Sequence, residues 1–142
     1  MKYLLDTCVV SELVKKHPNT NVLSWLENQD EANLYLSVLT FGEIRKGIEK
    51  ASDEKRKIKL TMWLEEDLKQ RFKGRIISID QSVAIKWGEI QGATEKVGKV
   101  MPSIDGLIAI SALVHHCTLV TRNISDMENS IVELFNPWNY SG

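Results

Sequence analysis

The sequence has 142 residues, of which 43% are hydrophobic and 26% are charged, the composition of an ordinary globular domain. Its two cysteines, Cys8 and Cys117, lack Cys-x-x-Cys spacing, which argues against a disulfide scaffold and a zinc site. The net charge of −1 argues against binding of nucleic acid by bulk electrostatics, unless the acids gather in a metal site and the bases lie elsewhere. We therefore expect one cytoplasmic domain over residues 1–142. We expect no membrane segment, since the longest apolar run is only Leu107 to Val114.

The first half of the chain alternates short apolar runs with segments of helical periodicity. It predicts a strand at 2–5, a helix at 7–16, a helix from about 20, a strand at 34–36 and a helix at 38–50. Pro18 ends the first helix, and Asn19 or Thr20 can cap the second.

The second half continues this alternation. It predicts a helix over about 53–72, a strand at 75–79, a helix capped by Asp80, a helix at 104–116 and strands at 118–121 and 131–135. The charge run from Asp53 to Lys59 is typical of a solvated helix face. Strands that alternate with helices indicate an α/β fold: a compact parallel-sheet sandwich with helices on both faces.

Two acids of the first half have ordinary structural explanations. Asp6 follows the first strand and is a good N-cap for the next helix. Glu43 lies three residues after Thr40, which is capping-box spacing. If that helix begins nearer Ser37, Glu43 lies on its second turn and needs another explanation.

Two acids of the second half are similar. Asp105 falls in the first turn of its helix, where the helix dipole favours an acid, although its apolar neighbours make an unpaired charge costly. Asn123 and Asp126 follow a strand, and either residue can cap a short turn.

All four acids nevertheless lie just past a strand or near the start of a helix. In an open parallel sheet such positions converge on one crevice. Carboxylates gathered there repel each other unless a cation joins them, and ligands that are all oxygen favour Mg²⁺ or Mn²⁺ over zinc.

Four segments of the sequence resemble the PIN-domain family, specifically its VapC- and FitB-like toxins. They are Tyr3–Glu12 (YLLDTCVVSE), Ser37–Gly47 (SVLTFGEIRKG), Ser103–Ala109 (SIDGLIA) and Leu119–Asp126 (LVTRNISD), and the closing Phe135–Trp138 (FNPW) resembles the FitB-type branch. Each segment alone is weak evidence, but the four occur in order at the family's usual spacing. The resemblance implies a PIN-like fold.

The resemblance also implies a set of metal ligands. Asp6 and Asp105 match the family's core ligands, and Glu43 completes the cluster. The fourth position varies within the family, so Asp126 or Asn123 takes it, and we assign Asp126. By this resemblance the same four acids, Asp6, Glu43, Asp105 and Asp126, are both metal ligands and catalytic residues.

Other positions receive supporting roles. By resemblance, Thr7 and Thr121 orient the acids, with Asn123 beside them, and Cys8 stands where many members have Asn or Ser, which predicts only a fine adjustment of the site. RNA needs positive charge nearby, and the candidates, each equally explained by solubility and helix-end pairing, are Arg45, Lys46, Lys15 and Lys16.

The function implied is the toxin of a toxin–antitoxin module. Such a protein is an Mg²⁺- or Mn²⁺-dependent endoribonuclease that uses metal-activated water on transfer, ribosomal or messenger RNA. By resemblance it forms a homodimer and binds a small antitoxin. The alternatives are a PIN nuclease of RNA maturation and a non-catalytic module like a phosphorylation receiver. The receiver needs an acid pair and a late lysine where Thr7 and Arg122 stand.

Overall fold

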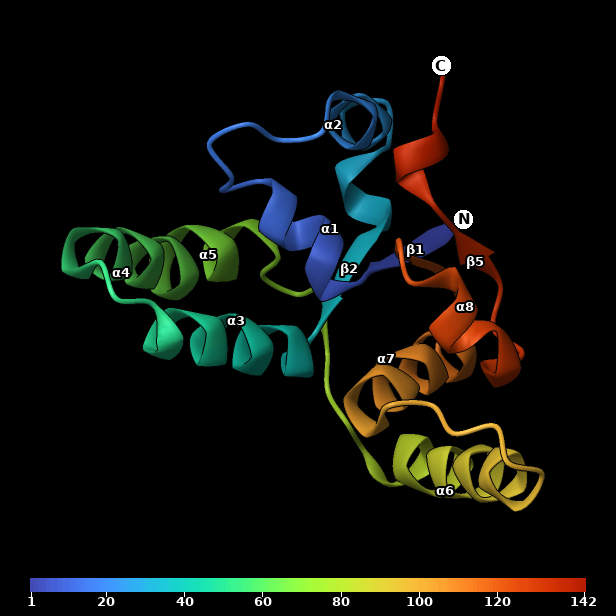
Figure 1. The fold of residues 1–142 in the computed structure, drawn as a ribbon. Coiled ribbons are helices and arrows are strands. Elements are labelled where there is room, and N and C mark those ends of the chain that lie inside the picture. The colour runs from blue at the N-terminus through green and yellow to red at the C-terminus, as the bar shows by residue number, and fades with distance from the viewer.

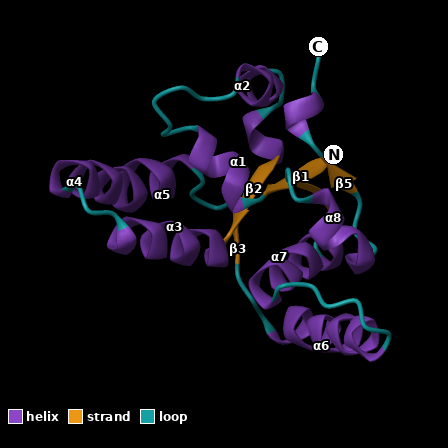
Figure 2. Cartoon of the chain, viewed as in Figure 1, coloured by secondary structure: helices purple, strands orange, loops and turns teal.

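The computed structural model, which describes residues 1–142, is built around a five-stranded sheet in the order β3-β2-β1-β4-β5 (Figures 1 and 2). All neighbouring strands run parallel. The strands are β1 (Lys2–Leu5), β2 (Leu34–Ser37), β3 (Ile76–Ile77), β4 (Cys117–Val120) and β5 (Leu134–Phe135). The predicted α/β fold with a parallel sheet is confirmed.

Helices cover both faces of this sheet (Figure 1). The longer ones are α2 (Thr20–Glu27), α3 (Val38–Lys50), α4 (Glu54–Met62), α6 (Gln81–Lys96) and α7 (Ser103–Val114). The shorter ones are α1 (Thr7–Glu12), the π-helical η2 (Trp63–Leu68), α5 (Lys69–Arg71), α8 (Ile124–Met127) and the 3₁₀ turns η1 (Glu31–Asn33), η3 (Glu128–Ser130) and η4 (Pro137–Asn139). None of the helices combines the length and apolar character that crossing a bilayer requires.

Successive side chains of the central strands point to opposite faces of the sheet and belong to two separate hydrophobic cores. Leu5 and Val120 point into the core beneath α1, α2, α3 and η2. Leu4 and Leu119 point into the core beneath α7. A two-residue period in a strand buried on both faces explains why these segments read as continuous apolar runs.

The order of the strands creates a switch point between β1 and β4. The chain runs outward from β1 through β2 to β3, then returns to the other side of β1 to form β4. Leu5 lies opposite Val120, and the Asp6 amide donates to the Val120 carbonyl at 2.9 Å. Open parallel sheets bind ligands in the crevice at such a point. We therefore expect the ligand-binding residues just after β1 and β4.

The predicted helix over 7–16 is too long. Helix α1 ends at Glu12, and the amides of Leu13, Val14 and Lys15 instead bond three residues back, which tightens the chain into a turn. The buried Glu12 carboxylate accepts from the Asn19 amide at 2.8 Å and thus holds the returning chain. Lys15 and Lys16 therefore lie beyond the helix.

The predicted helix over 53–72 is present, but its middle is the π-helical η2. Leu60, Leu64, Leu68 and Phe72 step by four, whereas an α-helix has about 3.6 residues per turn, so this row drifts around a regular helix. The wider π turn keeps the row on one face, and all four contact the same core.

The remaining differences are at element ends. The last strand contains only Leu134–Phe135, because Ile131 adopts a left-handed φ of 61° that breaks an extended run. The third strand shortens to Ile76–Ile77, and β4 begins one residue earlier than expected, at Cys117. Helix α7 spans 103–114 and ends before His116, which has a positive φ of 58°.

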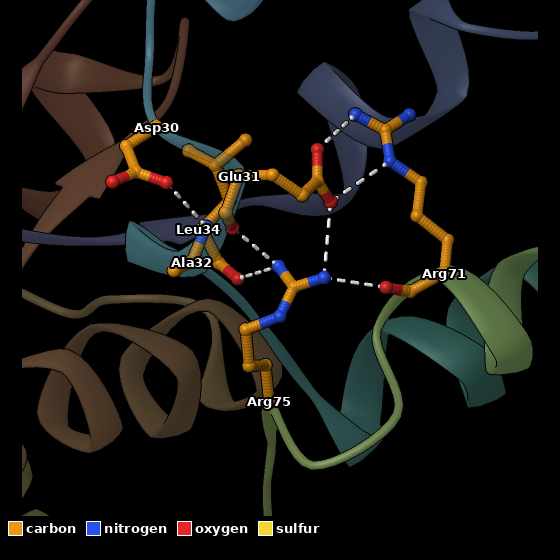
Figure 3. A network of polar contacts seen from close by, with 6 residues as sticks. All are labelled: Asp30, Glu31, Ala32, Leu34, Arg71 and Arg75. Atoms are coloured by element: carbon orange, nitrogen blue, oxygen red, sulfur yellow. Dashed lines mark hydrogen bonds and ion pairs between the residues drawn. The ribbon is translucent and has the colours of Figure 1, made fainter.

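An ion-pair cluster fixes the outer edge of the sheet (Figure 3). Glu31 accepts from both Arg71 and Arg75, at 3.0 and 3.1 Å. Arg75 also donates to the carbonyls of Glu31 and Leu34 at 2.6 Å each. The end of α5 is thereby tied to the start of β2, so these two arginines are occupied by structural contacts.

Candidate active site

Asp6 is the buried anchor of the site at the switch point. It is 3% exposed and caps α1, accepting from the Thr7 amide at 2.8 Å. Its other oxygen accepts from the Thr121 hydroxyl, which follows β4, at 2.7 Å. Burial raises the pKa of Asp6 above its usual range, and the hydrogen bonds from Thr121 and Thr7 offset part of that rise. Capping is thus a real role of Asp6, but it uses only one of its oxygens.

Glu43 is joined to the same cluster through Thr7. Helix α3 is capped by Ser37, so Glu43 lies on the second turn and the capping-box explanation with Thr40 is excluded. The Thr7 hydroxyl donates to Glu43 Oε1 at 2.5 Å. The predicted orienting role of Thr7 therefore has a direct geometric basis.

Asp105 forms no side-chain hydrogen bond and lies near enough to the other three acids for their charges to act on it. Helix α7 has Pro102 at its N-cap position and no side-chain cap. Burial, followed by the charges of Asp6, Glu43 and Asp126, raises the pKa of Asp105 to about 6. Asp105 lies in the first turn of α7, where the helix dipole favours an acid as expected, and the charges of the three other acids act on it in addition.

The loop after β4 supplies the fourth side of the site. Asp126 is exposed in α8, and the Asn123 side chain forms no capping bond, although its amide donates to Thr121 Oγ1 at 3.0 Å. The Arg122 guanidinium stacks 4.5 Å from the centre of the Trp138 ring, which holds the closing segment against this loop. Asn123 carries no charge, whereas the charge of Asp126 helps to raise the pKa of Asp105.

The four acids form an electrostatic cluster and not a closed cage. No three His, Cys, Asp or Glu side chains are grouped tightly enough to hold an ion as they stand. The candidate metal ligands, however, are all carboxylate oxygens. They repel one another, and at Asp105 this repulsion adds to the effect of burial in raising the pKa. Such a set fits a hard divalent cation, since an opposite charge relieves that repulsion. Asp105 and Asp126, which no hydrogen bond restrains, are the side chains free to rotate toward an ion.

Cys8 lies against this cluster. Its sulfur is 3.7 Å from both Asp6 Oδ2 and Thr121 Oγ1. Burial, followed by the Asp6 charge, raises the pKa of the Cys8 thiol. The neutral thiol therefore contacts the Asp6 carboxylate without adding a charge.

The basic candidates divide into engaged and available side chains. Arg45 is held by Glu49 at 2.5 Å and by the Thr61 hydroxyl at 3.3 Å. Lys15 pairs with Glu12 at 2.7 Å. Lys46 lines a hollow with Glu43, and Lys16 is exposed beyond α1.

Two residues of the site were not assigned from the sequence. Thr40 is fully buried, and its hydroxyl lies 3.2 Å from that of Thr7. Its spacing from Glu43, which we read as a capping box, instead puts both side chains on the face of α3 that meets Thr7. Burial raises the pKa of Glu12, but the hydrogen bonds from Lys15 and the Asn19 amide, together with the charges of Lys15 and Arg122, lower it below its usual value. No local sequence signal marks Glu12.

Comparison with known families agrees with this geometry. The family model described as "PIN domain" matches residues 3–125. The chain belongs to the PIN-domain family. Among related PIN proteins, Toxin FitB of Neisseria gonorrhoeae is 36% identical over 95% of this chain and 97% of its own length. VapC ribonuclease Y4jK of Sinorhizobium fredii is 33% identical over 95% and 96%. The solved structure of FitAB bound to an IR36 DNA fragment superimposes with a TM-score of 0.90 and 34% identity, covering 99% of this chain and 98% of that one.

Proposed function

We propose that this PIN protein is the toxin of a toxin–antitoxin module and acts as a metal-dependent endoribonuclease. The observation that carries the proposal is Asp105, whose pKa is raised by burial and then by the charges of Asp6, Glu43 and Asp126, beside the switch point of the sheet. Relatives that share a third of its sequence are named toxin and ribonuclease, which supports the same reaction.

The resident ion of this proposal is Mg²⁺ or Mn²⁺, held by Asp6, Asp105, Glu43 and Asp126. A divalent ion bound there would supply Lewis-acid polarisation of the scissile phosphate and would make a water molecule more acidic. It also lets a phosphodiester approach four acids without repulsion.

The residues of the chain prepare the site for this chemistry. Thr121 and the Thr7 amide fix both oxygens of Asp6, so its orientation requires no adjustment on binding. The Thr7 hydroxyl fixes Glu43. Asp105 has a pKa of about 6, so it is largely ionised near neutral pH, and a cation favours that form further.

The proposed partners follow from the relatives and from the reaction. RNA is the substrate, whether transfer, ribosomal or messenger, which places the protein in the cytoplasm. A solved relative is the FitAB complex, so we assign this chain a small antitoxin partner of its own. A homodimer completes the proposal.

The test is the chemistry of the cut ends. Incubation of purified protein with RNA and Mg²⁺ should give 5′-phosphate and 3′-hydroxyl ends, and EDTA should abolish the cutting. Cyclic-phosphate ends formed in EDTA would contradict the mechanism. The Asp6→Ala protein is the matched control for contaminating nuclease.

A growth assay separates the toxin from a PIN nuclease of RNA maturation. Expression of the wild-type chain alone should arrest growth, and Asp6→Ala should relieve the arrest. Equal growth with both proteins soluble and the wild type active in vitro would favour the maturation enzyme.

A further inference from the structure

The charge run of α4 is divided between two sides of the helix. It contains Lys55, Arg56, Lys57 and Lys59, and its sequence is typical of a solvated face. In the structure, Arg56 and Lys59 line one hollow, whereas Lys57 lines another together with Glu54. Lys55 lines neither. The run from Asp53 to Lys59 is exposed apart from the half-buried Lys57, so the predicted solvated face is confirmed, and part of it lines these hollows.

The hollow that contains Arg56 shares lining residues with a second hollow that reaches Thr7 and Glu43. It has a volume of about 450 Å³ and lies between α4 and the turn after α1. A second hollow of about 270 Å³ shares Lys15, Arg56 and Trp63 with it and continues to Thr7 and Glu43. We call these two adjoining hollows the basic groove; its cations are Lys15, Arg56 and Lys59, its apolar lining includes Leu60 and Trp63, and Asp67 is the one acid beside the cations in the larger hollow.

Two cations of the basic groove are unpaired. Neither Arg56 nor Lys59 forms a salt bridge, whereas Arg45, Arg71 and Arg75 are all held by glutamates. Figure 3 shows the latter two arginines around Glu31. Unpaired cations beside an acidic site can bind an anionic ligand without first breaking an existing ion pair.

We propose that the basic groove binds the single-stranded RNA that flanks the scissile phosphate. Arg56 and Lys59 contact backbone phosphates, with Lys15 between them and the site, and the Trp63 indole offers a surface on which a base stacks. This inference rests on the proposed ribonuclease function. Cations along a groove with an aromatic floor are the usual means of binding single strands without sequence preference.

The groove also explains how a protein with a net charge of −1 can bind RNA. A chain with little overall positive charge attracts RNA only if its cations are placed along the path of the backbone. An apolar floor of Leu60 and Trp63 also suits a protein segment, but the direct continuity with Thr7 and Glu43 favours a polyanion on its way to the site.

The experiment compares two double variants of α4 with equal loss of charge. Arg56→Gln/Lys59→Gln removes the cations of the groove, and Lys55→Gln/Lys57→Gln removes two cations of the same helix outside it. The probe is a random-sequence pool of unstructured 20-nucleotide RNA, and the readout is kcat/KM at several salt concentrations. Thermal melts confirm that both variants remain folded.

The groove variant should lower kcat/KM about 10-fold at moderate salt, through KM and not kcat. The dependence of log kcat/KM on log salt should become shallower by about 1.4, since each lost contact to a single strand removes about 0.7. The control variant should stay within about 2-fold of wild type, because neither of its cations lines the groove.

Three outcomes would overturn the proposal. Equal losses in both variants would show general attraction by α4 and no groove. Wild-type rates in the groove variant would show that its cations serve another purpose, such as docking a protein, and would leave the ribonuclease function standing. No cutting by wild type would contradict the proposed function itself, before any variant is compared.

Discussion

The hydroxyl of Thr7 donates to Glu43 Oε1 at 2.5 Å, across 36 residues of sequence. This bond joins the first turn of α1 to the second turn of α3, while the Thr7 amide contacts Asp6. One residue thus sets the positions of two of the four acids. The Thr7 hydroxyl has a single proton, which it gives to the Glu43 carboxylate. In its contact with Thr40 it must therefore accept, so the Thr40 hydroxyl is the donor.

Replacement of Thr7 by Val keeps the shape of the side chain and removes this donor. We expect RNA cleavage to fall about 10- to 100-fold, since a hydrogen bond to a charged group contributes about 1.5–3 kcal/mol. Thr7→Ser, which keeps the hydroxyl, should retain most activity. Similar rates for the Val and Ser variants would show that Thr7 does not position Glu43 for the reaction.

Gly106, which follows Asp105 in α7, has no room for a larger side chain, so we expect its replacement to destabilise the fold. A Cβ at Gly106 would lie 2.7 Å from Gln91 Oε1, and Gln91 is held by its bonds to Met101 and Glu95. Gly106→Ala should therefore lower the free energy of unfolding by about 1–3 kcal/mol, measured by denaturant titration. The control is Gly88→Ala on α6, where nothing lies within 4 Å of the added carbon. It should raise stability by about 0.5–1 kcal/mol. Stabilisation by both changes would mean that α6 and α7 pack less closely than described.

The sequence predicted much of this arrangement because its signals are local. Asn19, Asp53 and Asp80 all cap the helices that follow them, since a capping side chain bonds to amides two or three residues away. Thr7 and Thr121 were assigned as orienting residues from motif position, and both contact acids in the structure.

The features that the sequence did not predict depend on distant parts of the chain. Glu12 is buried only because the chain turns back and brings the Asn19 amide to it. Gln91 is buried because the carbonyl of Met101 accepts its amide, on a helix face that reads as polar. Conversely, the helical spacing of Val83, Trp87, Ile90, Thr94 and Val97 predicts that Val97 is buried, but it is 68% exposed, because α6 has already ended at Lys96.

The raised pKa of Asp105 predicts a pH dependence of metal-free stability. The folded-state pKa of about 6 exceeds the ordinary value of 3.8, so between these values the folded protein binds the proton more tightly than the unfolded chain. The stability from this group is therefore present at low pH and is lost as pH rises through 6. In EDTA, wild type should lose about 1 kcal/mol more than Asp105→Asn between pH 5 and 7, a value reduced for solvent screening of a partly exposed group. Parallel pH profiles in denaturant titrations would contradict the cluster.

The central claim, that Asp105 belongs to a metal-binding carboxylate cluster, is tested most directly by thermal melts of wild type and Asp105→Asn. Each protein is melted near neutral pH in EDTA and then with Mg²⁺ or Mn²⁺. In EDTA the variant should melt higher, because it lacks a charge held beside Asp6, Glu43 and Asp126. Added metal should stabilise wild type, by about 2.7 kcal/mol at 100 times Kd, and should stabilise the variant much less. A variant that melts no higher in EDTA and responds to metal as wild type does would show that Asp105 is no ligand.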